Sequence, residues 1–280
     1  MSSESSQRKD AAVPLSRPNL VLAHTEDWRP PAFEPPHSTM ARLRAWGRRL
    51  LDLQAASIWR DMKRLLPLVR GEVLDVGCGA QPYREFFSPQ THILGIDRAA
   101  VSDAFGYHES DVRYFSGDSW PVVPDSVDVI LSTETLEHVP DPARFLASAA
   151  RGLKAGGRLI LTVPFAARWH YIPYDYYRFT PSALNNLLSE AGFEDIAVYA
   201  RGNAVTVACY KILSLLLPLL FPQNVGTIRR IALMTLGLAT LPLAGVLALI
   251  GQWSLHRGSG DDCLGYTVVA TRSTGGKSSC

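Results

Sequence analysis

The chain has 280 residues, 47% of them hydrophobic, and a net charge of +2. This apolar content is enough to bury a core, which excludes disorder throughout the chain. The small net charge argues against a general polyanion-binding protein, and we expect no nucleic-acid partner. The four cysteines lie far apart without a CxxC pair, so they indicate neither a zinc site nor a disulfide framework.

The first segment, residues 1–39, is polar and rich in serine, proline and charge. It lacks both a sustained periodicity and the apolar stretch of a secretory signal peptide. We therefore expect a flexible arm, and a catalytic part that stays in the cytoplasm.

The next segment, residues 40–69, is predicted to form a basic amphipathic helix that is broken at most once. Apolar residues recur at helical spacing from Leu43 through Trp46 to Met62. The opposite face carries basic residues, which are Arg42, Arg44, Arg48, Arg49, Arg60, Lys63 and Arg64. Such a face suits an anionic membrane surface, and equally suits solvent on a helix that caps the core.

Between residues 72 and 163, short β-rich runs alternate with helical stretches, which predicts an α/β fold with a parallel sheet. The expected strands are 72–76, 92–96, 112–115, 127–132, 158–163, 195–200 and 264–271. The expected helices are 83–87, 141–153 and 181–191. A long apolar insertion separates the last two strands.

A glycine-rich turn follows the first predicted strand in the run Asp75-Val76-Gly77-Cys78-Gly79. Glycine permits a tight turn and close approach of a ligand at the carboxyl edge of the sheet. Asp97 ends the second strand 20 residues beyond Gly77, where a carboxylate can accept both hydrogen bonds of a ribose diol. Asp75 can attract an ammonium group. These features suit a nucleoside ligand.

Two features favour a ligand without phosphates over a nicotinamide dinucleotide. Pro82 stands where helix N-terminal amides would begin to cradle a pyrophosphate, and the third glycine of GxGxxG is missing. Asp118 and Ser119 follow the third strand, where a short polar pair can read an adenine amino group. An oxidoreductase is further disfavoured because the chain lacks a catalytic Tyr-x-x-x-Lys.

The ordered runs DVGCG, GID, GDSWPVVPDSVDVI, TLEHV, LKAGGRLILTVP and EAGF resemble the class I S-adenosylmethionine-dependent methyltransferases, especially their type 11 branch. The resemblance covers roughly residues 70–200. It implies a doubly wound, Rossmann-like sheet of seven strands in the order 3-2-1-4-5-7-6, and S-adenosylmethionine as the cofactor. By position, it implies that the methionine end is held by Asp75, Gly77 and Gly79, the ribose by Asp97, and the adenine by Asp118 and Ser119.

Two histidines are candidate catalytic bases. A hydroxyl acceptor must lose its proton near the moment of attack, and an imidazole titrates close to neutrality. His138 follows the fourth predicted strand and His170 follows the fifth, so both lie at the carboxyl edge beside the cofactor. The ExxEH spacing of Glu134, Glu137 and His138 also resembles the metal-binding motif of small-RNA 2′-O-methyltransferases and ubiquinone-pathway O-methyltransferases. We favour a base or a loop-ordering role for these residues and assign no metal.

Residues 170–181 are dense in aromatic side chains with interspersed hydrogen-bond donors, which is typical of an acceptor-binding lid. The candidate substrate-binding residues are Tyr171, Tyr174, Asp175, Tyr176 and Arg178. The segment resembles an H-x-x-P-x-D-x-x-R-[FY]-T stretch of methyltransferases of bacterial cell-surface glycan or lipid pathways. A loop ion pair between Asp175 and Arg178 is an equal alternative to substrate contact.

The apolar insertion contains two runs, 204–221 and 231–250, each long enough to span a bilayer. Because the flanking strands must join one sheet, the chain crosses a membrane twice or not at all. Pro218, Pro222 and Pro242 favour broken or re-entrant helices, so monotopic insertion is preferred. The residues expected at headgroup level are Arg201, Lys211, Arg229, Arg230, Trp253 and Arg257. The alternative is a soluble helical cap on the core or in a dimer interface.

Together these patterns predict a methyltransferase at the cytoplasmic face of a membrane. Its expected reaction is O-methylation of a lipid-linked, glycan or other membrane-associated acceptor, and the sequence indicates no oligomeric state. The alternatives are a soluble small-molecule methyltransferase with an apolar cap and a non-catalytic membrane adaptor. The predicted parts are an arm (1–39), a basic helix (40–69), a methyltransferase domain (70–203 plus 259–273) and the insertion (204–258).

Overall fold

A computed structural model describes residues 38–117, 119–223 and 225–275, so nearly all of the expected arm lies outside the described residues. Its centre is a seven-stranded sheet in the order β3-β2-β1-β4-β5-β7-β6. The strands are β1 (Gly71–Val76), β2 (Thr91–Arg98), β3 (Val112–Phe115), β4 (Val127–Thr133), β5 (Leu153–Pro164), β6 (Phe193–Arg201) and β7 (Gly265–Arg272). Pairing is parallel except at β7, which runs antiparallel to β5 and β6. The predicted strands and their order are confirmed.

Alternate side chains of the central strands enter two cores, one on each face of the sheet. Leu74 of β1 packs with α5 (Pro142–Gly152) and α6 (Pro181–Glu190), whereas its neighbour Val73 packs against α3 (Leu53–Leu65). Successive side chains of a strand point to opposite faces, so continuous apolar runs fill both cores. Each fully buried leucine stabilises the fold by about 1.5–3 kcal/mol.

The predicted basic helix is two helices with different surroundings, α2 (Thr39–Leu51) and α3. Asp52 separates them, because its side chain accepts a hydrogen bond from the Ala55 amide and caps α3. Leu53, Ile58 and Met62 of α3 are buried, as expected for a helix that caps the core. In contrast, α2 leaves three large apolar side chains 58% exposed, namely Met40, Leu43 and Trp46.

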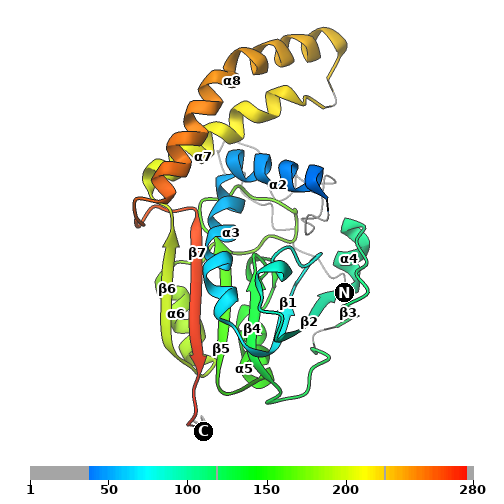
Figure 1. The fold of residues 1–280 in the computed structure, drawn as a ribbon, viewed down its shortest axis with the longest axis vertical. Helices are drawn as coiled ribbons and strands as arrows, with labels where there is room; N and C mark the ends of the chain where they lie inside the picture. Colours follow the sequence, from blue (N-terminus) through cyan, green and yellow to red (C-terminus); the bar gives the residue numbers. More distant parts are fainter. Residues whose placement is uncertain (1–37, 118, 224, 276–280) are drawn as a thin grey trace, which may run out of the picture.

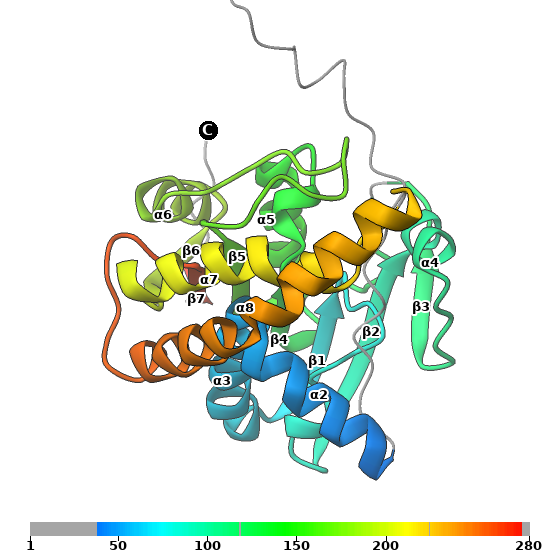
Figure 2. The ribbon, with the colours of Figure 1, turned by 90° about the horizontal axis from the view of Figure 1, so that it is seen from above.

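The apolar insertion forms a hairpin of α7 (Ala204–Leu216), the short 3-10 helix η4 (Leu217–Leu220) and α8 (Thr227–Leu255). This hairpin lies at one end of the molecule, beyond the sheet, and strand β7 ends at the other (Figure 1). Seen from above, α2, α7 and α8 extend across the ends of the strands (Figure 2). Gly251 permits α8 to approach α3 closely, since a Cβ there would lie 2.4 Å from Leu53 Cδ1.

Three expectations for helices were wrong. The predicted helix 83–87 is only a 3-10 turn, η2 (Arg84–Phe86), and Ser88-Pro89 follow it directly. Helix α4 (Ala99–Phe105) was missed, because its N-cap residue, Arg98, makes no side-chain capping hydrogen bond that could indicate a helix start. Helix α8 continues through Pro242 where a break was expected, so one proline did not interrupt a helix supported by apolar neighbours.

Candidate active site

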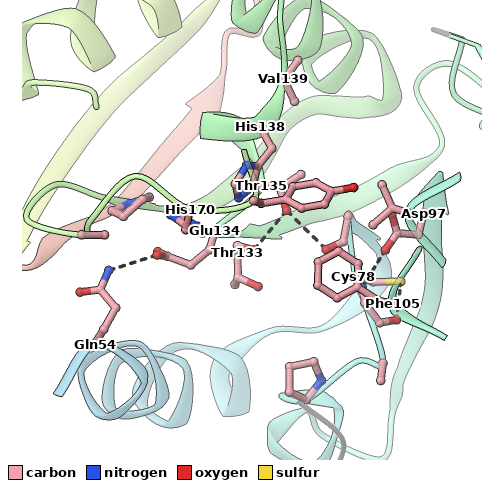
Figure 3. Close-up of a pocket in the computed structure, with 18 of the residues that line it drawn as sticks. Gln54, Cys78, Asp97, Phe105, Thr133, Glu134, Thr135, His138, Val139 and His170 are labelled. Carbon is pink, nitrogen blue, oxygen red and sulfur yellow. Dashed lines mark hydrogen bonds between the residues drawn. The ribbon is translucent and has the colours of Figure 1, made fainter. Parts of the chain in front are cut away.

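A cavity of about 1170 Å³ lies at the carboxyl edge of the parallel strands. Its floor is formed by the loops that follow β1, β2 and β4, and its upper wall by α2, α7 and η4. Figure 3 shows Asp97 and Cys78 on one side of this cavity and His138 and His170 on another. A crevice at this edge is where open α/β sheets bind their ligands.

The glycine-rich turn and Asp97 form one part of the cavity wall. Gly77 and Gly79 both have positive φ, and the space above the Gly79 Cα is open. Asp97 Oδ2 accepts hydrogen bonds from the Gly79 amide at 2.9 Å and from the Tyr107 hydroxyl at 2.9 Å. Burial raises the pKa of Asp97, although these hydrogen bonds oppose the shift. The aspartate thus fixes the turn while it lines the cavity.

Two of the remaining residues predicted to hold a nucleoside ligand, Asp75 and Ser119, lie outside this wall. Asp75 is 6% exposed and is not part of the cavity lining, although it directly precedes the lining residues Val76 and Gly77. Burial, reinforced by the charge of Asp97, raises the pKa of Asp75 to about 7. Ser119 is exposed and does not line the cavity, and Asp118 lies outside the described residues.

The two predicted catalytic histidines are brought together, with ring centroids 5.0 Å apart. His138 Nδ1 lies 2.8 Å from the Tyr174 carbonyl oxygen, and its Nε2 lies 3.6 Å from Glu137 Oε1. His170 Nδ1 lies 3.1 Å from Asp175 Oδ2. Both imidazoles line the cavity.

Their surroundings shift the pKa values of the two histidines in opposite directions. Burial lowers the pKa of His138, and the neighbouring His170 adds to this effect. At His170 burial acts in the same direction, but the hydrogen bonds to Asp175 and the Arg168 carbonyl outweigh it and raise the pKa. A neutral base beside a more readily protonated imidazole is a common division of acid and base roles.

The aromatic lid is tied together by Asp175, which is 8% exposed. Its carboxylate pairs with both terminal nitrogens of Arg178, at 2.6 and 2.7 Å, and accepts the His170 amide at 3.0 Å. Arg178 and the hydrogen bonds from His170 lower the pKa of Asp175 against the effect of burial. These contacts support the loop ion pair. Tyr171 lines the cavity, whereas Tyr174 and Tyr176 are exposed.

Three side chains could hold a metal ion, because the ligand atoms of Glu137, His138 and His170 lie within 4.8 Å of one another. Glu137 is fully buried, and neither of its carboxylate oxygens has a hydrogen-bond partner among the residues that the structure describes. Glu134 is not in this group. Its Oε1 accepts Arg201 Nη2 at 2.7 Å and its Oε2 accepts Gln54 Nε2 at 3.1 Å.

The expectation that Arg201 lies at the headgroup level of a membrane was wrong. It is 3% exposed and donates to Glu134, to the Val163 carbonyl at 3.0 Å and to Ser57 Oγ at 3.2 Å. No role in the site was expected for Arg201, Gln54 or Tyr107. No local sequence pattern indicates that an arginine at the end of a strand pairs with a carboxylate 67 residues away.

Comparison with known proteins shows the family of this chain. A family described as methyltransferase domain matches residues 40–198, more than half of the chain. The chain belongs to this methyltransferase family. The enzyme is similar to curated ubiquinone biosynthesis O-methyltransferases. The relative from Thiobacillus denitrificans is 30% identical over 162 residues, which cover 49% of this chain and 69% of that protein.

A second curated relative and two solved structures are also similar to this chain. The ubiquinone biosynthesis O-methyltransferase of Cereibacter sphaeroides strain ATCC 17029 is 28% identical over 167 residues, or 51% of this chain and 68% of the relative. Among solved structures, the enzyme is similar to a Haemonchus contortus phosphoethanolamine N-methyltransferase complex. The identity is 17% and the TM-score is 0.46, over 78% of this chain and 53% of that one. A putative methyltransferase from Bacillus halodurans has 18% identity and a TM-score of 0.45, over 78% of this chain and 100% of that one.

The cofactor of the enzyme is S-adenosylmethionine. The cavity suits such a ligand, because a turn with two positive-φ glycines and open space at Gly79 permits close approach, and Asp97 presents a carboxylate beside it. The predicted fold class and the predicted enzyme class are therefore confirmed.

Proposed function

We propose that the enzyme transfers a methyl group to a hydroxyl of a lipid-linked or otherwise membrane-associated acceptor. The observation that carries this proposal is the composition of the upper cavity wall. Most of its lining residues come from the apolar hairpin, and these are Tyr210, Leu213, Ser214, Leu217, Pro218 and Phe221. The segment that most resembles a membrane anchor is thus also the segment that encloses the reaction space.

For the cofactor, we propose the arrangement that the sequence indicates. Gly77 and Gly79, with Asp75 behind them, would hold the methionine end, and Asp97 the ribose. Asp118 and Ser119 would lie at the adenine. When bound, the cofactor supplies a methyl group on a sulfonium, so the chain mainly has to align the acceptor and exclude water.

For the proton, we propose His138 as the general base. Its Nδ1 is bound to the Tyr174 carbonyl, which leaves Nε2 to accept the proton that the acceptor hydroxyl releases. His170, whose pKa is raised, would serve as a cation that attracts an anionic part of the acceptor. Tyr171 would bound the acceptor on the lid side.

For the membrane contact, we propose that α2, α7 and α8 face the lipid. Helix α8 is long and apolar enough to cross a membrane by length and composition, and only 17% of its most apolar window is buried. The apolar side chains that α2 exposes lie beside it, next to Arg42 and Arg44, which are also exposed. Apolar area with adjacent cations is typical of helices that lie in an anionic membrane interface.

The experiment that tests this proposal follows a labelled methyl group. The enzyme is incubated with methyl-labelled S-adenosylmethionine and membranes of its host, and lipid is then separated from water-soluble products. We expect alkali-stable label in the lipid fraction, as a methyl ether requires. Label confined to the aqueous fraction would favour a soluble small-molecule methyltransferase. A protein that binds S-adenosylhomocysteine but never transfers label would favour an adaptor.

A further inference from the structure

Four neighbouring strands bring their carboxyl ends to the cavity in one row. In the sheet order β3, β2, β1, β4, the residues at or just beyond these ends are Gly117, Asp97, Gly77 and Glu134. All four line the cavity. With adenine near the end of β3 and the ribose at Asp97, the methionine end extends past Gly77 toward β4. Glu134 is the acidic residue at that end of the row.

The acid expected to bind the methionine ammonium, Asp75, lies behind the turn and is not part of the cavity lining. Taking a carboxylate out of water favours its neutral form, and the nearby Asp97 adds to this effect. Glu134, in contrast, lines the cavity and has an oppositely charged partner. Its side chain is 25% exposed, and it pairs with a guanidinium.

The side chain of Glu134 is held from two sides. Arg201, from the end of β6, binds Oε1. Gln54, from α3, binds Oε2 (Figure 3). The backbone is fixed as well, because the Glu134 amide donates to the Thr162 carbonyl at 3.0 Å and φ is +48°. A carboxylate offers about four acceptor positions. Two protein partners therefore leave acceptor capacity for a third donor.

Arg201 is built into the sheet at this point. A Cβ on Gly265 would lie 2.4 Å from Arg201 Nη2, so the glycine leaves the space that the guanidinium occupies. The Arg201 carbonyl accepts the Leu264 amide at 2.9 Å, which closes the base of the α7–α8 hairpin. Arg201 thus links the start of the hairpin to the cavity wall.

We propose that Glu134 binds the ammonium group of the methionine end of the cofactor, and that Arg201 and Gln54 are positioning residues that hold its carboxylate for this contact. The inference rests on the cofactor arrangement proposed above and is independent of the acceptor. It would give the methionine end a charged partner on the cavity surface that Asp75 does not supply.

The test compares two ligands that differ at the amino acid portion. S-adenosylhomocysteine carries the ammonium, whereas 5′-methylthioadenosine lacks it. Calorimetric titration should show that Glu134→Gln lowers the affinity for S-adenosylhomocysteine by about tenfold to a hundredfold, as expected for a lost charged hydrogen bond. The affinity for 5′-methylthioadenosine should be unchanged. The matched control is Glu190→Gln, an exposed residue at the end of α6, which should change neither affinity.

Arg201→Met tests the positioning role. It should reduce S-adenosylhomocysteine affinity selectively, and the double variant with Glu134→Gln should bind no worse than the weaker single variant, since both act through one contact. If Arg201→Met does not fold, Gln54→Leu replaces it. The inference is overturned if Glu134→Gln lowers the affinities for both ligands equally, or lowers neither. A wild-type enzyme that binds neither ligand instead contradicts the cofactor arrangement itself.

Discussion

His138 Nδ1 lies 2.8 Å from the carbonyl oxygen of Tyr174 and joins the turn after β4 to the lid. The amides of Tyr176 and Tyr177 strengthen this connection by donating to the Glu137 carbonyl at 2.9 and 3.3 Å. The lid is thereby fixed in register with the histidine. A carbonyl acceptor assigns the proton of the neutral imidazole to Nδ1 and leaves Nε2 as the base.

Replacement of His138 by glutamine should lower kcat by about 10²–10⁴-fold, the range for a positioned general base. The amide side chain retains a donor toward Tyr174 but cannot accept the proton at neutral pH. Steady-state rates with the lipid acceptor would measure the loss. Unchanged S-adenosylhomocysteine affinity serves as the control for an intact cavity, and an unaltered kcat would remove His138 from the mechanism.

The pH dependence of kcat/KM should be bell-shaped. The pKa of His138 is lowered from its ordinary value near 6.5, so the base loses activity only as the pH falls below that value. The pKa of His170 is raised, so its cationic form is lost as the pH rises above 6.5. His170→Asn should abolish the alkaline limb and keep the acidic one. A profile that the substitution leaves unaltered would argue against the cationic role.

Chelation should not reduce activity. Burial and the charge of Glu134 raise the pKa of Glu137, which favours a neutral carboxyl in the group with His138 and His170. Glu134, the other acid of the ExxEH motif, is engaged by Arg201 and Gln54. Rates measured in EDTA, and again after addition of Mn²⁺, would check this. Loss in EDTA with recovery in Mn²⁺ would assign the three groups to a metal.

Asp97→Asn should lower the affinity for S-adenosylhomocysteine by about tenfold or more, because an amide cannot accept both hydrogen bonds of a ribose diol. The carboxylate also accepts the Tyr107 hydroxyl and the Gly79 amide. A modest loss of stability, about 1–3 kcal/mol, should therefore accompany the weaker binding. Calorimetry and thermal unfolding measure the two effects separately. Unchanged affinity would contradict the ribose assignment.

Charged substitutions on α8 should release the enzyme from anionic vesicles. Leu236→Asp and Leu243→Asp change side chains that are 51% and 50% exposed. Each charge in a lipid-facing position opposes insertion, so the pair should abolish sedimentation with phosphatidylglycerol-containing vesicles. Val123→Asp, at an exposed position in the loop before β4, is the matched control and should have no effect. Persistent sedimentation of the double variant would favour the helical cap.

Local patterns in the sequence determined the strands of the sheet and much of the floor of the cavity, and the family resemblance of the motifs implied the strand order. Apolar runs of strand length, the glycine turn at Gly77 and Gly79, and the caps at Asp141 and Thr180 act within a few residues, so they can be recognised without the fold. The placement of both histidines at one edge followed from the parallel strands that precede them. Their rings do lie side by side.

Tertiary structure alone decided the rest of the site. Glu134 meets Gln54 across 80 residues and Arg201 across 67, and the hairpin forms a wall of the cavity from the far end of the chain. The two halves of the basic helix have the same periodicity, but only α3 buries its apolar face, because only α3 lies against the sheet. Periodicity specifies that a face is apolar. What covers that face depends on which distant elements pack there, and no local pattern contains that information.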